Sequence, residues 1–205
     1  MSVVLDIIGS IVIGSMVILI GLRLDQSIAG TADASMAQLN VQETAVEIVR
    51  TMERDFRRIA YNAADPTQCI LVFDTVNNDI VFKGDIDNDG NGVPGAGLET
   101  VEWKLGPTIT GLQNTHIHTL LRSASNIDGG APKVVGSWVT MFKIAGYDRS
   151  GKPTNDKNLI RIVETTIQVE NPYLTQDQVN QDTTSYARIF WRQTWLSSVN
   201  LKRWG

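Results

Sequence analysis

At 205 residues, the chain is long enough for one ordinary domain with an appendage and too short for two full domains. Its 42% hydrophobic and 20% charged residues are typical of folded proteins, which excludes general disorder. The net charge of -4 argues against nucleic acid as a partner, and the single cysteine, Cys69, excludes a disulfide within the chain.

The N-terminal segment Val3–Leu22 is almost entirely apolar, with Asp6 as its only ionisable side chain. A helix of this length spans roughly 30 Å, the thickness of the hydrocarbon layer of a bilayer, so we expect it to cross a membrane. A cleaved signal peptide and a buried core helix are the alternatives. A signal peptide normally begins with basic residues, whereas none precedes Arg23. A core helix would need a head large enough to surround it.

The basic residues that usually mark the cytoplasmic side of a membrane anchor are missing before the apolar segment. Two explanations remain open. Either the N-terminus faces outward, or a short basic leader has been removed from the chain.

Asp6 is unusual within the apolar segment, because a carboxylate inside a bilayer costs about 2.5–3.5 kcal/mol near the middle of a helix and less near its end. One explanation is that the carboxylate simply reaches the membrane interface. The other is that it pairs during assembly with the N-terminal amine, carried by Met1, of a neighbouring subunit. Gly9, Gly14 and Gly21 give the segment small surfaces suited to close helix packing.

Residues 23–64 are predicted to continue the helix as an amphipathic spine. Apolar residues recur there at spacings of three and four: Leu24, Ile28, Met36, Leu39, Ala45, Ile48, Val49, Met52, Phe56 and Ile59. Pro66 predicts that the helix ends near Asn62, and Gly30-Thr31 is the place where it could bend or unwind. The stem is therefore residues 1–64, of which residues 1–22 form the membrane-spanning part.

Residues 65–205 are predicted to form a β-rich head. Short apolar or alternating runs are separated by clusters of Gly, Asn, Asp and Pro, and no helix-sized pattern alternates with them. The expected fold is thus α+β, a long N-terminal helix packed on a mainly antiparallel sheet. The expected strands are 69–73, 79–82, 100–105, 116–122, 139–145, 159–169 and 185–196.

An acidic run in the head, residues 85–92, places carboxylates at alternate positions before a glycine. Such a loop can turn several oxygens toward a hard cation, so we expect a structural Ca²⁺ site rather than a catalytic one. An Asx-rich hairpin without an ion is the alternative. The candidate ligands are Asp85, Asp87, Asp89, Asn91 and, further on, Glu99.

The remaining reactive side chains, the two histidines and the cysteine, predict no catalytic site. His116 and His118 would share one face of a strand, and exposed surface histidines are the simpler interpretation. Cys69 is expected to pack as a small apolar group. Phosphate-binding glycine motifs and hydrolase signatures are absent from the sequence, so we expect no enzyme.

Taken together, the stem and several later motifs resemble the type IV pilin superfamily, and most closely its larger minor pilins and the secretion pseudopilins. Asp6 lies at or next to the position where pilins carry Glu. The run from Met52 to Tyr61 is similar to the family's motif at the end of the long helix. The loop from Asp85 to Gly92 that leads into Glu99–Trp103 is similar to its acidic loop. Leu121-Arg122 and residues 139–148 continue the similarity.

This resemblance implies a subunit that waits in the inner membrane, is extracted by an assembly machine and joins copies of itself in an extracellular filament, with heads outward. A single-pass anchored binding or adhesion module and a pseudopilin of a secretion system are the alternatives. A membrane-tethered enzyme would need a catalytic cluster that the sequence does not offer.

Overall fold

The computed structural model describes residues 2–86, 97–125, 130–174, 186–196 and 201. One long helix, α1 (Ser2–Arg57), is followed by a short 3-10 helix, η1 (Pro66–Gln68), and seven strands. The strands are β1 (Ile70–Asp74), β2 (Asp79–Gly84), β3 (Glu99–Thr108), β4 (His118–Ala124), β5 (Lys133–Tyr147), β6 (Ile162–Glu170) and β7 (Arg188–Leu196). This is the predicted α+β fold, with a helix packed on an antiparallel sheet.

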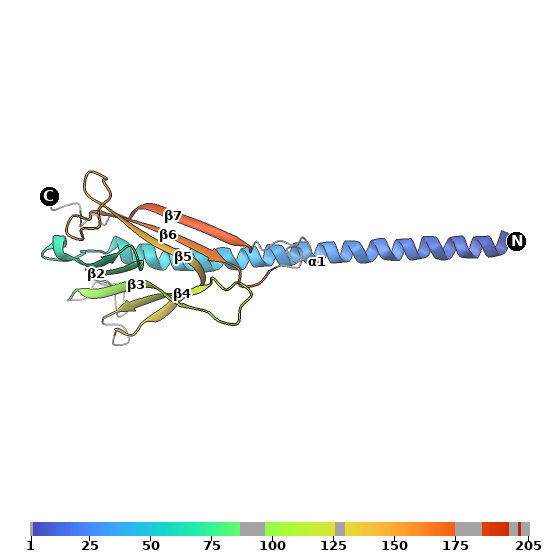
Figure 1. The fold of residues 1–205 in the computed structure, drawn as a ribbon, viewed down its shortest axis with the longest axis horizontal. Coiled ribbons are helices and arrows are strands. Elements are labelled where there is room, and N and C mark those ends of the chain that lie inside the picture. The colour runs from blue at the N-terminus through green and yellow to red at the C-terminus, as the bar shows by residue number, and fades with distance from the viewer. Residues whose placement is uncertain (1, 87–96, 126–129, 175–185, 197–200, 202–205) are drawn as a thin grey trace.

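The seven strands form one antiparallel sheet in which neighbours in sequence are also neighbours in space, in the order β1 to β7. Figure 1 shows the sheet gathered around the second half of α1, while the first half projects away from it. At 1.5 Å per residue the 56 residues of α1 measure about 84 Å. The head therefore covers only part of the helix.

The core lies between the inner face of the sheet and one face of α1. The helix contributes buried residues at spacings of three and four, as the amphipathic pattern predicts: Val41, Ala45, Ile48, Met52 and Phe56. Phe56 meets Phe82 of β2 and Trp103 of β3 edge-on, with ring centroids 5.4 and 6.4 Å apart. Val49, predicted on this face, is only half-buried.

The sheet curls because β5 bends in its middle. Residues 133–139 of β5 pair with β4, and residues 139–147 pair with β6. Trp138, at the junction, has a left-handed backbone with φ of 67°, and the register shifts on both sides of it. Such a bulge increases the bend of a strand. β5 can therefore pass from one side of α1 to the other.

Two predicted details of the helix are corrected. The helix ends at Arg57, not near Asn62, because Ala60 donates its backbone N–H to Lys83 O at 2.8 Å and both Ala60 and Asn62 have positive φ. No bend or unwinding interrupts α1 at Gly30-Thr31. There the Thr31 hydroxyl bonds back to Ser27 O at 2.9 Å, and one glycine costs only about 1 kcal/mol within a long helix.

Candidate functional site

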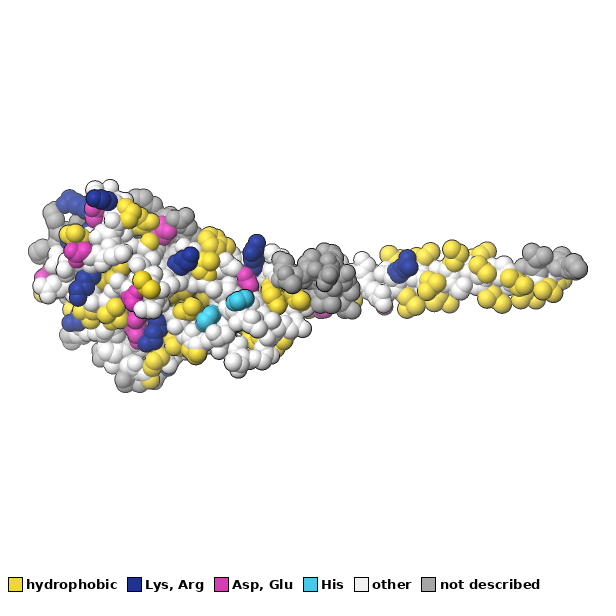
Figure 2. Space-filling model, viewed as in Figure 1, with side chains coloured by type: hydrophobic (Ala, Val, Ile, Leu, Met, Phe, Trp, Pro, Cys, Tyr) yellow, Lys and Arg dark blue, Asp and Glu magenta, His cyan; other side chains and the backbone are white. Residues whose placement is uncertain are grey.

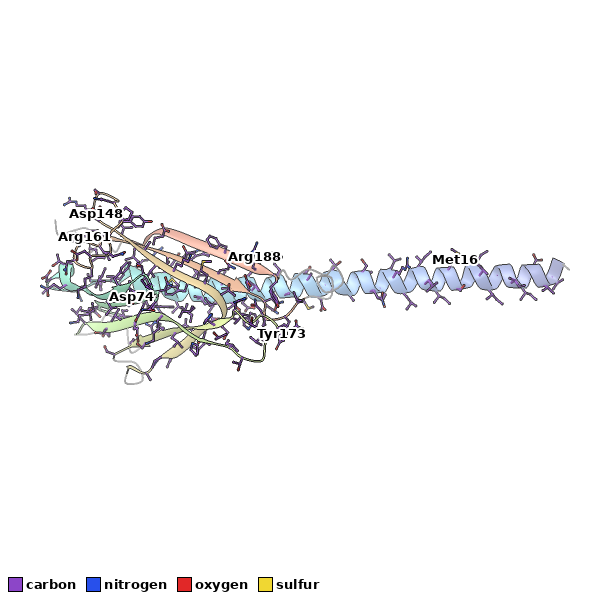
Figure 3. All side chains as sticks on the ribbon, in the orientation of Figure 1. Met16, Asp74, Asp148, Arg161, Tyr173 and Arg188 are labelled. Atoms are coloured by element: carbon purple, nitrogen blue, oxygen red, sulfur yellow. The ribbon has the colours of Figure 1, made fainter. Side chains whose placement is uncertain are left out.

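The first candidate site is the apolar segment of α1. Its side chains are exposed on every side of the helix, as Ile11 and Ile13 illustrate, which lie on opposite sides and are 65% and 66% exposed. Figure 2 shows hydrophobic side chains along this projecting part, and Figure 3 shows Met16 where no other element approaches α1. Among the described residues α1 is the one helix long and apolar enough to cross a membrane. Such an apolar surface is unfavourable in contact with water and is normally covered by lipid or by protein.

Asp6 is exposed near the start of the apolar segment. Ser10 donates its hydroxyl to the backbone carbonyl of Asp6 at 2.8 Å, and no ion pair with Asp6 occurs among the residues that the structure describes. Met1, the other predicted assembly residue, lies outside the described residues. The carboxylate of Asp6 is thus free to meet a cation from another molecule.

Further along α1, one apolar face stays exposed beside the head. Leu24, Ile28, Leu39 and Val46 are all exposed, and their separations of 4, 11 and 7 residues place them on one side of the helix. The amphipathic pattern predicted in this part of the helix includes Leu24, Ile28, Met36 and Leu39, and the structure leaves all four exposed.

This outward face forms the floor of an open groove of about 900 Å³, which we call the outer groove. Next to it, Ile189 and Trp191 of β7 form a smaller hollow of about 290 Å³ with Ala45, Val46 and Val49 of α1. The groove has two apolar side chains, Leu39 and Val46, among polar and charged ones, which suits another amphipathic helix. The outer groove is lined by Leu39, Gln42, Glu43, Val46, Glu47, Arg50 and Thr51.

A buried charged cluster, which the sequence analysis missed, fixes α1 to the sheet. Asp55 is fully buried, and its carboxylate accepts hydrogen bonds from Trp103 Nε1 at 3.0 Å and from Arg122 Nη2 at 3.1 Å. Arg122 Nε also donates to the same carboxylate. Trp103 and Arg122 are cross-strand partners of β3 and β4. The available signal was Asp55 itself, which follows Ile48 and Met52 at helical spacing on the buried face.

The second candidate site is the connection between β2 and β3, where the acidic run was predicted to bind Ca²⁺. Two of the predicted ligands, Asp85 and Glu99, are described and buried at the ends of these strands. The others, Asp87, Asp89 and Asn91, lie outside the described residues. Within the described part of the chain, no three His, Cys, Asp or Glu side chains form a metal-binding group. The Ca²⁺ site stays a prediction.

The histidines and the cysteine lie apart from both candidate sites. His116 precedes β4 and is exposed, while Nδ1 of His118 lies 3.1 Å from Gly106 O. Cys69 is buried, as expected for a small apolar group, and burial raises the pKa of its thiol. The thiol is therefore protonated and unreactive at neutral pH.

No protein-family model and no curated protein matches the chain. The architecture, a long N-terminal apolar helix packed on an antiparallel sheet, is nevertheless pilin-like. It combines an exposed apolar segment at one end with a head that carries an outer groove along the same helix.

Proposed function

We propose that the chain is a structural subunit of an extracellular type IV pilus-like filament and has no catalytic activity. Before assembly the apolar segment lies in the inner membrane, and assembly machinery then extracts it. The partners in the filament are copies of the same chain. Nucleic acid is not a partner.

The observation that carries this proposal is the exposure of the apolar segment. Removing a large aliphatic side chain from water is worth about 1.5–3 kcal/mol, and the segment contains a long series of them. A lipid bilayer satisfies this requirement for one molecule. A bundle of identical helices satisfies it for many molecules outside the membrane.

Within a bundle, close packing replaces lipid contacts, because lipid tails are as apolar as leucine side chains. Gly9, Gly14 and Gly21 have open space around their Cα atoms, so a neighbouring helix can approach there. The outer groove extends the same kind of surface along the part of α1 that carries the head. We propose that it receives the apolar segment of a neighbouring subunit.

Asp6 gives this assembly a polar contact. Its carboxylate is unfavourable inside any apolar bundle unless a cation meets it. The N-terminal amine of Met1 in a neighbouring subunit is the proposed partner. This pairing would fix the relative position of adjacent helices during extraction from the membrane.

Electron microscopy of the full-length protein tests the proposal. After detergent removal, the wild-type chain should form helical filaments, whereas Asp6→Ala should leave the head folded by circular dichroism and impair filament formation. Asp25→Ala, which removes another exposed carboxylate of α1 beyond the apolar segment, is the matched control and should polymerise normally.

The possible outcomes separate the hypotheses. Normal filaments from Asp6→Ala would refute the pairing role of Asp6 but not the filament itself. A wild-type chain that stays monomeric and bound to a micelle would refute the filament and favour a single-pass anchored binding or adhesion module. Short pseudopilus-like fibres that form only with secretion components would indicate a pseudopilin.

A further inference from the structure

The two edge strands of the sheet, β1 and β7, differ in how well their outer sides are protected. An edge strand has unpaired backbone N–H and C=O groups, and proteins commonly shield it with a bulge or a lysine. β1 has both, since its register shifts around Leu71 and Lys157 Nζ donates to Leu71 O at 3.0 Å. β7 pairs regularly with β6 from Arg188 to Gln193, and among the described residues no strand pairs with its other side. Figure 1 shows β7 at the border of the sheet.

The ladder between β6 and β7 shows which backbone groups face the free edge. Asn171 donates its N–H to Ala187 O at 2.8 Å. In an antiparallel pair, positions that bond to the partner strand alternate with positions that do not. Ala187 and Ile189 therefore bond to β6, whereas the N–H and C=O groups of Arg188 and Phe190 point to the free edge. An extended chain can pair with these groups without breaking a bond of the sheet.

The apolar hollow between β7 and α1 lies along this free edge. Its described lining comes from these two elements and not from β6, and Val46 also belongs to the outer groove, so the hollow opens beside β7. Neighbouring strands are about 4.8 Å apart, so a strand added to β7 would cover the hollow and place alternate side chains in it. The apolar lining consists of Ile189, Trp191, Ala45, Val46 and Val49.

Two guanidinium groups flank the hollow. Arg50 of α1 contributes to its lining, and Arg188 is exposed next to Ile189 in β7. Among the residues that the structure describes, neither arginine forms a salt bridge. Figure 3 shows Arg188 at this border of the sheet. A bound segment with carboxylates beside an apolar side chain complements both charges.

We propose that β7 is a docking edge to which a partner protein adds an extended segment of alternating apolar and acidic residues. In this mode of recognition, main-chain hydrogen bonds supply affinity, and the hollow and the two arginines supply specificity. The other edge strand of a second copy, β1, is a poor occupant because its own edge is shielded. The inference is independent of filament assembly.

Titration calorimetry of the full-length protein in detergent tests the proposal, with a short synthetic peptide in which valine and glutamate alternate. We expect saturable binding. A peptide with lysine in place of glutamate should bind at least about tenfold more weakly, because its cations would lie beside Arg50 and Arg188. Methylation of the backbone nitrogens of the acidic peptide should weaken binding similarly, since it removes the donors of the added strand.

Phe190→Pro tests the edge itself, because it removes an N–H that faces the free edge and none that bonds to β6. It should bind the acidic peptide at least about tenfold more weakly than the wild type. Phe190→Thr is the matched control, since it keeps the N–H and suits a strand, and its affinity should stay within about twofold of that of the wild type. Should Phe190→Pro fail to fold, the methylated peptide decides.

The proposal is overturned if the acidic peptide does not bind saturably, if both peptides bind equally, or if the peptide binds Phe190→Pro as well as the wild type. Phe190→Pro should still form filaments, which separates this inference from the proposed function. If it did not, and the wild type did not bind the peptide, the occupant of the edge would be a second copy and not a separate partner.

Discussion

Asp55 is the residue on which the attachment of the head to α1 most depends. One carboxylate in the buried face of the helix receives hydrogen bonds from side chains of two strands, Trp103 of β3 and Arg122 of β4. Removing one member of a buried ion pair leaves the other charge uncompensated, whereas replacing both by apolar residues is often tolerated. The cluster is therefore expected to behave as a unit.

Arg122→Met should destabilise the head by about 3–5 kcal/mol, because the buried Asp55 loses both hydrogen bonds from Arg122 and keeps only a 3.9 Å contact with the exposed Arg54. The double variant Asp55→Leu with Arg122→Met should recover much of this loss. Urea denaturation, monitored by tryptophan fluorescence, measures the free energy of unfolding of the single and the double variant. The half-exposed pair of Glu102 and Lys104 is the control, and Lys104→Met should cost no more than about 1 kcal/mol. Additive losses in the double variant would contradict the interpretation.

Gly136 is the residue that lets α1 approach β5. A Cβ atom at this position would lie 2.2 Å from Cδ1 of Ile48, a fully buried side chain. Gly136→Ala should therefore destabilise the head by about 1–3 kcal/mol through overpacking, as thermal unfolding would measure. Adding Ile48→Val, which removes the clashing methyl group, should restore part of the loss. Gly97→Ala, with nothing within 4 Å, is the control.

At the scale of elements, hydrophobic periodicity predicted the long helix and all seven strands in order. The residues at which the strands begin and end were harder to predict. β5 begins six residues before its predicted start, because Lys133–Trp138 pair with β4 without a regular alternation and the strand then bends at Trp138. The amphipathic pattern of α1 includes residues from Ala45 onward that meet the sheet, and also Leu24, Ile28, Met36 and Leu39, which stay exposed. Before Ala45, periodicity cannot distinguish a face covered by the chain's own sheet from one left for another partner.

Contacts between side chains of different strands and α1 could not be predicted from the sequence, because they depend on the register of the strands. The buried Asp55 and Arg122 are 67 residues apart in sequence, and only the register between β3 and β4 brings Arg122 next to Trp103. The acidic run was visible in sequence, but the burial of Asp85 and Glu99 depends on how β2 and β3 end.

The two halves of α1 should be separable. Among the side chains that the structure describes, those of residues 2–29 add nothing to the buried hydrophobic core, which begins at Ala37. A fragment starting at Gln26 should therefore fold, remain soluble without detergent and have a free energy of unfolding in urea within about 0.5 kcal/mol of that of the full-length protein. Circular dichroism and sedimentation velocity check these expectations. A fragment that aggregates or unfolds would show that the first half of α1 also supports the head.

For the whole molecule, the proposed filament includes a contact between the outer groove of one subunit and the apolar segment of another. Val46 is 47% exposed in the groove, so Val46→Glu should leave the stability of the isolated head unchanged within about 0.5 kcal/mol. In a filament, however, the new carboxylate would be buried against apolar side chains without a cation, which is strongly unfavourable. Electron microscopy should then show few or short filaments.

Val76→Glu is the matched control for this surface, because the same substitution is made on the β1–β2 turn of the head at a valine that is 85% exposed. Filaments from Val76→Glu should be normal in length and number. If Val46→Glu also polymerised normally, the outer groove would not be a subunit contact, and helix packing would have to rest on the apolar segments alone. If both variants failed to polymerise, added negative charge on the head would explain the loss better than the groove does. Only a defect confined to Val46→Glu links the exposed face of α1 to assembly.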